Sequence, residues 1–320
     1  MSYTSPNPGE IEVEEEISFA VGLVNVNTQK SIYLPGENAT ITVGVLDNEG
    51  YRVPGANVSV EITTPSGKKI YYSTSAGNIL DRGDGTYVLH YQPNELGNYT
   101  VNAFATHLDL GIDASYESFF EVRNFREFDI LREAPTIVEL SPFDVYINLS
   151  PSVIARNLTI VEVVPKDFGV SVRDAEVVEG NDTKLIIWKI DELSFNSTRL
   201  SYRLRPPLIS PSLYMIGPLR IYYYNESGSY VFEEIKAWSI AIDQARYIFK
   251  YFIFWRDTNI VVEPYALCRG ENYTIKTLIM NSGDAAGLAQ NMYMRVRAAG
   301  EAIYLDLPAK GWDFWGGDSN

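Results

Sequence analysis

The chain has few of the residues that bind metals, form disulfide bonds or carry out catalysis. Its 320 residues include one cysteine and two histidines. A lone cysteine excludes an internal disulfide framework, so we expect Cys268 to be a small buried apolar residue, with an intermolecular thiol as the alternative. His90 and His107 have no third ligand at metal-binding spacing and belong to no Ser-His-Asp set, so we expect both on the surface.

Long apolar runs are also absent. No segment reaches the ~20 apolar residues that span a membrane, so we expect no transmembrane segment in this chain. The acidic residues 1–16 lack the apolar core of a signal peptide. The nearest candidate run, Tyr247–Trp255, is short and contains Lys250. If the protein is secreted, its signal peptide and any anchor lie outside these residues.

Positive charge is scarce as well. Lys and Arg number 26 against 41 Asp and Glu, which gives a formal net charge of −15. Such a surface repels phosphate backbones and argues against nucleic acid as a partner. No glycine-rich loop follows a strand and opens a helix, so nucleotide binding has no support either. We therefore expect no catalytic residues, no enzymatic activity and no cofactor.

Loop carboxylates are the remaining candidates for a metal site. Asp47 with Glu49, and Asp81 with Asp84, could hold calcium together with backbone carbonyls. They follow no fixed ligand pattern, so we expect solvated turn residues and no metal. Residues 82–84 read Arg-Gly-Asp, the letters of a cell-attachment tripeptide. A turn that opens the next strand already accounts for the glycine and the aspartate.

Alternation of apolar and polar residues dominates the chain, and helical periodicity is scarce. This pattern, punctuated by turn residues, predicts an all-β fold of serial immunoglobulin-like antiparallel β-sandwiches. We predict an N-terminal lead-in at residues 1–16, an immunoglobulin-like sandwich at 17–122 and a second β-sandwich at 123–243. Residues 244–320 would form a third, incomplete β-sandwich.

The first sandwich is predicted from seven strands in about 105 residues, the size of an immunoglobulin-like domain. These strands are Ile17–Val26, Ala39–Leu46, Val58–Thr63, Lys69–Ser73, Thr86–Tyr91, Gly97–Thr106 and Ser115–Val122. The turn motifs at 33–37 (Tyr-Leu-Pro-Gly-Glu), 83–87 (Gly-Asp-Gly-Thr-Tyr) and 97–99 (Gly-Asn-Tyr) resemble those of the immunoglobulin-like domains of macroglobulins, filamins and prokaryotic surface adhesins. That resemblance implies a spacer or a binding platform.

The second sandwich is predicted from six strands. They are Phe143–Leu149, Asn157–Val164, Lys184–Ile190, Thr198–Arg205, Leu219–Tyr224 and Tyr230–Ile242. The motifs at 163–168, 187–193 and 200–204 resemble repeat-type sandwich domains of archaeal and bacterial surface proteins. In that pattern Trp188 faces the core. The proline-rich residues 205–211 predict a rigid crossing or an edge segment, because proline donates no ladder hydrogen bond.

The third region begins with a segment, residues 263–285, that is similar to the opening of adhesion-type domains of archaeal surface proteins. An Asn-Ser-Gly turn at Asn281 follows its early strand. Too few strands follow for a complete sandwich of about seven. The region is therefore either a domain cut short or a sandwich completed by another chain, since an unpaired edge invites such completion.

An excess of N-glycosylation acceptor sequences is the strongest functional signal. Nine of the 21 asparagines begin an Asn-x-Ser/Thr sequence, where 41 Ser and Thr residues predict about three by chance. None of the nine has proline in the middle position. The acceptors are Asn38, Asn57, Asn98, Asn148, Asn157, Asn181, Asn196, Asn225 and Asn272.

Strand phase tests whether these asparagines can carry a bulky glycan. Side chains alternate between the two faces of a strand. In the strand at 58–63 the apolar residues share one face, and Asn57 lies on the other. Asn98, Asn148 and Asn272 likewise occupy the polar phase of their strands. The pattern therefore predicts acceptors that point to solvent, as glycosylation requires.

An aromatic run near the start of the third region is a candidate interface. Its members are Tyr247, Phe249, Tyr251, Phe252, Phe254 and Trp255. A strand that is aromatic on both faces is buried between layers or at an interface. Two readings stay open, a core between domains and a contact with a neighbouring subunit.

These patterns together predict a structural or adhesive extracellular glycoprotein, a component of an archaeal cell-surface layer, an adhesin or an extracellular filament. Its partners would be other surface proteins or copies of itself, and its only attached groups would be N-linked glycans. The alternative is a partner- or sugar-binding accessory module of a larger surface protein or of a macroglobulin-like protein.

Overall fold

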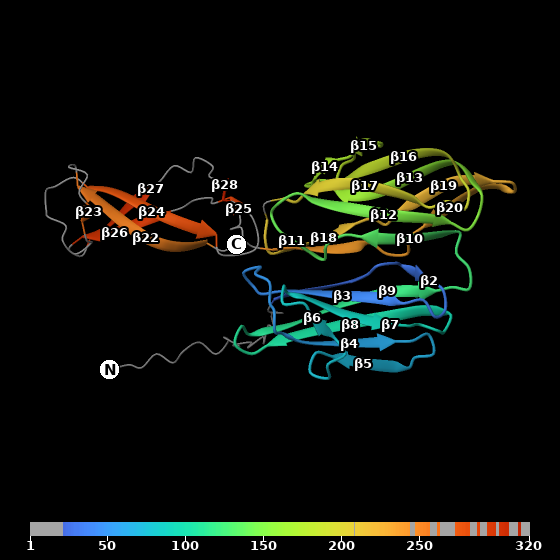
Figure 1. Cartoon of the computed structure of the whole chain (residues 1–320), viewed down its shortest axis with the longest axis horizontal. Helices are drawn as coiled ribbons and strands as arrows, with labels where there is room; N and C mark the ends of the chain where they lie inside the picture. The colour runs from blue at the N-terminus through green and yellow to red at the C-terminus, as the bar shows by residue number, and fades with distance from the viewer. Residues whose placement is uncertain are drawn as a thin grey trace, which may run out of the picture.

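The computed structural model describes residues 22–207 and 209–243 with their side chains, and beyond them the backbone of the seven strands β22–β28. All regular structure in the described part of the chain is β-strand, which confirms the predicted all-β sandwich class (Figure 1). Within these residues there is no helix of the length and apolarity needed to cross a membrane.

The first sandwich consists of two sheets that face each other across a common core. The first sheet has the order β1 (Leu23–Thr28), β3 (Ala39–Leu46), β7 (Thr86–Tyr91) and β6 (Leu80–Asp81). The second has the order β2 (Ile32–Tyr33), β9 (Ile112–Val122), β8 (Gly97–His107), β4 (Asn57–Thr63) and β5 (Lys69–Ser73).

Aromatic side chains fill the centre of this core. The rings of Tyr99 and Phe120 stack with centroids 4.9 Å apart, and Tyr33 meets Phe120 edge-on at 5.3 Å. All three side chains are buried. Such pairs stabilise a core beyond the area they bury, so the turn motifs that contain Tyr33 and Tyr99 also supply core residues.

The second sandwich has two main sheets and a small third sheet. One sheet has the order β10 (Phe128–Glu133), β12 (Phe143–Pro151), β17 (Thr198–Arg205) and β14 (Gly169–Ser171). The opposite sheet has the order β15 (Glu176–Glu179), β16 (Thr183–Leu193), β13 (Ala155–Pro165), β19 (Arg220–Asn225) and β20 (Gly228–Glu233). The small sheet has the order β11 (Ile137–Val138), β21 (Trp238–Ile242) and β18 (Ser212–Ile216).

Some strand predictions for this sandwich are right and others are wrong. Trp188 is 4% exposed and belongs to the core, as predicted. The single strand predicted at Tyr230–Ile242 is wrong, because β20 and β21 lie in different sheets. The break falls at Glu234, whose buried carboxylate binds Arg132. The sequence pattern also missed β10, β11, β14, β15 and β18, which are short or lie beside prolines and turns.

A charged cluster lies inside the second sandwich. The Arg132 guanidinium donates to Glu162 Oε2 at 3.1 Å and to Glu234 Oε2 at 2.6 Å. The Tyr202 hydroxyl donates to Glu162 Oε1 at 2.7 Å. Burial alone would lower the pKa of Arg132, but the charges of the two glutamates raise it well above its usual value. The guanidinium therefore remains charged and holds three strands at one point.

Loss of this cation should be strongly destabilising. Arg132→Met leaves two carboxylates in the core without their partner, and we expect the free energy of unfolding to fall by about 3–5 kcal/mol in urea denaturation. Arg156→Met is the control, since it removes an exposed ion pair with Glu192 worth about 0–1 kcal/mol. Equal losses in the two variants would contradict a structural role for the cluster.

Beyond residue 243 the backbone continues as strands. β22 (Tyr247–Arg256) lies between β23 (Val261–Val262) and β24 (Tyr273–Asn281) in an antiparallel sheet. Two further pairs are formed by β25 (Gly287–Leu288) with β28 (Asp313–Phe314), and by β26 (Tyr293–Ala298) with β27 (Glu301–Asp306).

Candidate functional site

The predicted glycan acceptors lie at the surface of both sandwiches. Two of them, Asn148 and Asn225, are half-buried, and Asn272 lies outside the described residues. The exposed acceptors are Asn38, Asn57, Asn98, Asn157, Asn181 and Asn196. Exposure is necessary for glycosylation and does not by itself establish it, so glycosylation stays a prediction.

Two of these asparagines have distinctive local geometry. Asn157 has a φ of 51° at the register shift between Arg156 and Thr159, a left-handed conformation that asparagine tolerates better than most residues. The amide nitrogen of Asn148 donates to Glu133 Oε1 at 2.6 Å. A glycan at Asn148 would have to be accommodated beside that bond, whereas Asn157 is exposed.

The loop carboxylates close their own turns. Asp47 Oδ1 accepts from the backbone N–H groups of Glu49 at 3.1 Å and Tyr51 at 2.8 Å. Asp84 Oδ1 accepts from Thr86 N–H at 2.9 Å, so the aspartate of the Arg-Gly-Asp tripeptide opens strand β7. In the described ranges no three His, Cys, Asp or Glu residues are grouped to hold a metal.

The two histidines differ in exposure. His90 is exposed, and its Nδ1 lies 3.3 Å from Thr40 Oγ1 and 3.4 Å from Asn38 Nδ2. His107 is half-buried, with a buried Nδ1. The surface prediction therefore holds for His90 and is wrong in part for His107. Cys268 lies outside the described residues.

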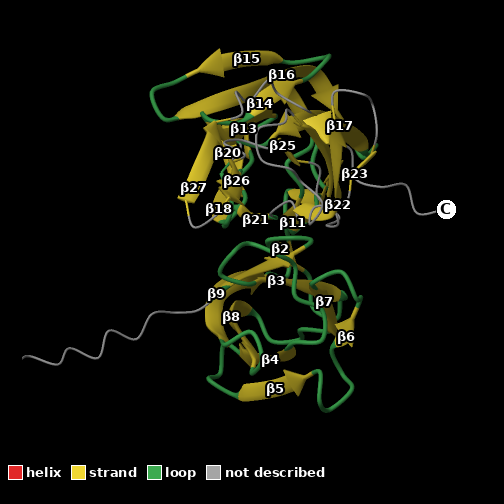
Figure 2. Ribbon diagram, turned by 90° about the vertical axis from the view of Figure 1, so that its left-hand side faces the viewer, coloured by secondary structure: helices red, strands yellow, loops and turns green. Residues whose placement is uncertain are grey.

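A network of buried polar side chains joins the two sandwiches. We call it the polar seam, and it comprises Asn25, Asn27, Thr136 and Ser239. Asn25 Nδ2 donates to the backbone oxygens of Thr136 at 2.9 Å and Ser239 at 3.1 Å. Asn27 Nδ2 donates to Ser239 O at 2.7 Å, and Ser239 N–H donates back to Asn27 Oδ1 at 2.8 Å. Figure 2 shows β21 and β11 of the second sandwich facing the first.

The seam requires glycine at position 44. A Cβ on Gly44 would lie 2.9 Å from Ile137 Cγ1 and would also collide with the amide oxygen of Asn25. Glycine at this position thus lets the backbone of β3 in the first sandwich approach β11 of the second. Sequence alone does not show what covers an outward strand face, so it does not identify Asn25 and Asn27 as an interface. Their i, i+2 spacing is the one signal, since it places both side chains on the same face of β1.

Ion pairs flank the seam. Arg52 Nε lies 2.7 Å from Asp243 Oδ2 at one position. Elsewhere Lys30 Nζ lies 2.8 Å from Asp129 Oδ2, and Arg126 donates to both carboxylate oxygens of Glu37 at 2.7 Å. The first two pairs link the first sandwich to the second, and Arg126 ties the linking segment back to the first sandwich. The contact between the sandwiches therefore combines hydrogen bonds and ion pairs with a small apolar cluster of Leu46, Ile137 and Ala241.

Removal of the Asn27 side-chain amide tests the seam. Asn27→Leu leaves the N–H and C=O groups of Ser239 buried without this partner, and we expect a loss of about 2–4 kcal/mol in the free energy of unfolding. Proteolysis of the linking residues 123–127 should accelerate. The exposed Asn94, changed to leucine, is the matched control. If both variants cleave and unfold as the unmodified chain does, the seam does not hold the sandwiches together.

A lysine also crosses between the sandwiches. Lys236 Nζ donates to Ser118 Oγ on β9 at 3.1 Å. Burial lowers the pKa of Lys236 from 10.5 to about 7, and the charge of Glu234 raises it in part. Between about pH 7 and 10.5 the unfolded chain binds more protons at this residue than the folded chain, so stability rises with pH in this window.

Substitution of Lys236 should therefore have a pH-dependent effect. Relative to the unmodified chain, we expect Lys236→Met to be favoured more at pH 6 than at pH 9, because the variant no longer buries a charge at low pH. Urea unfolding at both pH values measures this difference. Lys189→Met, at an exposed lysine, should show no such dependence, and an equal difference at both values for Lys236→Met would contradict the argument.

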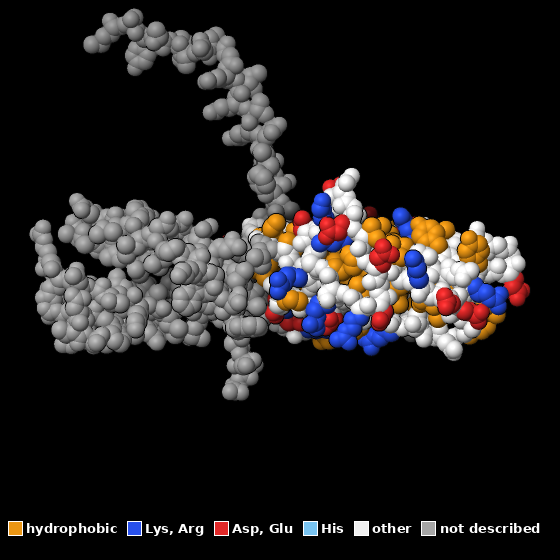
Figure 3. All heavy atoms as spheres, turned by 90° about the horizontal axis from the view of Figure 1, so that it is seen from above, with side chains coloured by type: hydrophobic (Ala, Val, Ile, Leu, Met, Phe, Trp, Pro, Cys, Tyr) orange, Lys and Arg blue, Asp and Glu red, His pale blue; other side chains and the backbone are white. Residues whose placement is uncertain are grey.

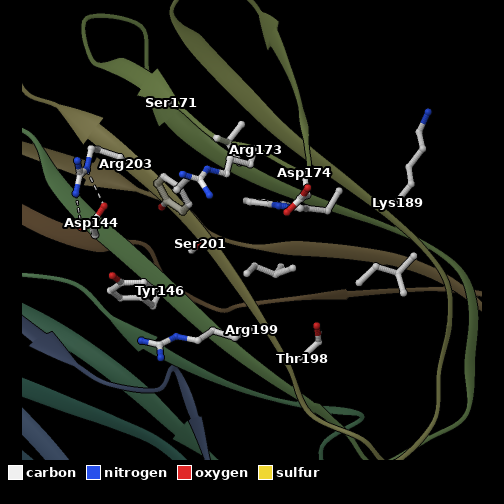
Figure 4. Close-up of a pocket in the computed structure, with 15 residues that line it drawn as sticks. Asp144, Tyr146, Ser171, Arg173, Asp174, Lys189, Thr198, Arg199, Ser201 and Arg203 are labelled. Atoms are coloured by element: carbon white, nitrogen blue, oxygen red, sulfur yellow. Dashed lines mark hydrogen bonds and ion pairs between the residues drawn. The ribbon is translucent and has the colours of Figure 1, made fainter.

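An open groove lies on the second sandwich where its two sheets separate. It has a volume of about 740 Å³. Its walls carry Arg199 and Arg203 of β17, and Tyr146 and Asp144 of β12, as Figure 4 shows. Arg203 Nε donates to Asp144 Oδ1 at 2.8 Å and lowers the pKa of that carboxyl. The Arg199 guanidinium lies 4.0 Å from the centre of the Tyr146 ring.

The predicted aromatic interface lies in the C-terminal strands. The backbone of Tyr247–Arg256 forms β22, and its register with β24 shifts between Phe249 and Tyr251. Because of this shift, the simple alternation of faces used in the prediction does not hold along the whole strand. The side chains of the six residues, Tyr247, Phe249, Tyr251, Phe252, Phe254 and Trp255, lie outside the described residues, so their interface role stays a prediction.

Comparison with known proteins supports the fold of the first sandwich. A family model for the filamin/ABP280 repeat matches residues 18–107. This confirms the resemblance to filamin-type immunoglobulin-like domains that the turn motifs indicated. The match covers less than a third of the chain. No curated protein matches the sequence.

Several solved structures are similar at low identity. A DUF4785-family protein from Legionella pneumophila is 14% identical with a TM-score of 0.28, over 68% of this chain and 57% of that one. A Salmonella alpha-2-macroglobulin is 14% identical with a TM-score of 0.27, over 98% of this chain and 22% of that one. The chain thus spans less than two thirds of either protein.

A third structure is covered almost completely. BcpA, the major pilin subunit of Bacillus cereus, is 9% identical with a TM-score of 0.29, over 89% of this chain and 96% of that one. At TM-scores of this size the three likenesses carry no argument about the assembly or partners of this chain.

Proposed function

We propose that the chain is a structural or adhesive glycoprotein of the cell surface, a component of a surface layer, an adhesin or an extracellular filament, and that it acts without catalysis. The observation that carries this proposal is the polar seam. It fixes two immunoglobulin-like sandwiches in one orientation through bonds between buried groups, with Asn27 and Ser239 at its centre.

Rigidity is the property that such a role requires. Contacts between domains of one chain are usually modest, and relative motion is the default. Here an incorrect orientation would leave the polar groups of Asn25, Asn27 and Ser239 buried without partners, at about 1–3 kcal/mol each. The two sandwiches therefore behave as one rigid unit that transmits force or presents a surface at a fixed angle.

The acceptor asparagines fit the same role. Six of the nine are exposed and lie on both sandwiches. Glycans at these positions add bulk at the surface without disturbing a core, because the neighbouring inward residues stay buried. Asn57, for example, is exposed while the next residue, Val58, is fully buried. A glycan coat of this kind suits an extracellular location, which we also propose.

One observation favours the alternative of a sugar-binding accessory module. On the outer face of β19, Tyr222 is 42% and Tyr224 54% exposed. Beside them, Arg220 of β19 and Glu233 of the neighbouring strand β20 form an exposed ion pair. Aromatic rings beside charged groups can bind sugars, so this face is the place where that alternative would be tested.

Glycopeptide mass spectrometry of the protein from its native source tests the main proposal. We expect sugar on most of the exposed acceptors, including Asn57 and Asn157. Asn94 is the internal control, since it is also exposed but begins no acceptor sequence. Unmodified asparagine at most of the exposed acceptors would overturn the glycoprotein assignment.

A further inference from the structure

The groove on the second sandwich follows a strand edge that is only partly paired. β17 pairs with β12 along nearly its whole length, from Thr198 to Leu204. On its other side it pairs with β14 only at Arg203–Arg205. Within the described part of the chain, no strand pairs with that side of residues 198–202. Alternate residues of a strand direct their N–H and C=O groups sideways, so this edge can accept another strand.

The opposite wall has the same character. β15 pairs with β16 only from Lys184 to Ile187, and no other strand of the described ranges pairs with that side of residues 188–193. The segment 172–175 crosses from β14 in one sheet to β15 in the other. The groove is thus an open side of the sandwich, bounded by this crossover and by the turn at 194–197.

The floor and the rim of the groove differ in chemistry. Trp188, Leu200 and Tyr202 line its floor and are almost fully buried. Arg199 and Arg203 stand on the outer face of β17, with side chains 53% and 59% exposed. Among the groove residues, four carry positive charge and two carry negative charge. The lining is therefore basic in a chain whose net charge is −15.

Arg173 adds to this basic rim. It stands on the crossover segment, is exposed, and makes no ion pair within the described residues. In Figure 4 its guanidinium extends over the groove near Ser171 and Asp174, while Lys189 points away. The view from above in Figure 3 shows Lys and Arg side chains beside hydrophobic ones on this side of the molecule.

One segment of the chain matches the groove in both pattern and charge. Residues 10–19 read Glu-Ile-Glu-Val-Glu-Glu-Glu-Ile-Ser-Phe. With period two, the even positions 10–16 are all glutamate, and the odd positions are apolar except Glu15. A strand with this sequence has one acidic face and one mainly apolar face.

We propose that the segment at residues 10–19 of a second copy of this chain adds as a strand to the uncovered edge of β17. An added strand places its side chains on the same two faces as those of β17. Its glutamates then stand beside Arg199 on the outer face, and Arg203 follows on the same face just beyond the unpaired stretch. Its Ile11, Val13 and Ile17 extend the inward row that contains Leu200 and Tyr202.

The position of the groove favours another copy over the same chain. β1 begins at Leu23, which packs near Ile137 and Ala241 at the contact between the sandwiches. Figures 1 and 2 both place β14, β15 and β16 on the side of the second sandwich that faces away from the first. Residues 20–22, which join the segment to β1, span at most about 11 Å when extended, and they would have to pass around the second sandwich to reach its far side.

This inference rests on the proposed structural role and supplies the contact by which copies would assemble. Each copy offers one segment and one groove, which are different surfaces. Such a heterologous contact generates a ring or an open filament rather than a closed symmetric dimer. Assembly by this contact is therefore directional.

A charge-swap experiment on the full chain tests the proposal. One variant carries Arg199→Glu and Arg203→Glu, and the other carries Glu12→Lys and Glu14→Lys. We expect each variant alone to self-associate on the order of a hundredfold more weakly than the unmodified chain in sedimentation velocity, since like charges then face each other. Mixing the two should restore association, because the reversed groove of one accepts the reversed segment of the other.

Further variants separate the proposed contact from other causes. Arg156→Glu with Arg220→Glu reverses two exposed arginines outside the groove and should leave association unchanged. Val13→Pro should abolish it without changing net charge, since proline blocks a ladder hydrogen bond. Restoration on mixing also shows that both charge-swap variants are folded.

Three results would overturn the proposal. They are an unmodified chain that stays monomeric at all concentrations, variants that associate normally, and variants that show no recovery on mixing. If the segment instead binds within its own chain, the protein would give the first of these results and remain a monomer at every concentration. None of these results bears on the glycopeptide measurement, so the surface-glycoprotein role can stand or fall independently.

Discussion

The hydrogen bonds between Asn27 and Ser239 hold the two sandwiches in one arrangement. The relative positions of the groove and of the acceptor asparagines depend on that arrangement. Asn25 and Asn27 stand on the outward face of β1, where water would otherwise satisfy them. Once buried, amide groups need protein partners, and backbone groups of β21 bind the amide nitrogens of both residues and the amide oxygen of Asn27. This requirement makes the orientation specific, because a rotated contact would bury the same groups unpaired. Gly44 permits the close approach on which the seam depends.

The second sandwich combines a rigid centre with an incomplete edge. At its centre, Arg132 and two glutamates form a cluster that is fully enclosed and mutually satisfied. At its side, β14 and β15 cover only part of β17 and β16, and the sheets separate there. A rigid core keeps this opening in a fixed shape, so the basic rim with Arg199 and Arg203 is held ready for a strand of opposite charge. A surface of this kind and an outward set of acceptor asparagines both fit the extracellular structural role that we propose.

The sequence predicted much of the fold of the first sandwich and less of the second. Strands such as Ala39–Leu46 and Lys69–Ser73 have the predicted bounds, because alternation and turn residues are local signals. The second sandwich contains short strands and sheet changes whose cause is not local. The chain leaves its sheet at Glu234 because that carboxylate meets Arg132, which lies 102 positions away. No periodicity near Glu234 reveals such a partner. The same distinction applies to the candidate sites. An acceptor sequence is three consecutive residues and can be read from the sequence, whereas the groove is formed by strands that are distant in the sequence.

What the sequence by itself determined is the set of properties that each strand carries alone. Alternation made the chain all-β, and the phase of Asn57 and Asn98 placed these side chains on the solvent face. What only the tertiary structure decided is which outward faces are covered. Asn25 and Asn57 both occupy polar phases of their strands, yet Asn25 is buried against the second sandwich and Asn57 is exposed. The reason is physical: a strand fixes which way a side chain points, while only packing fixes whether water or protein meets it.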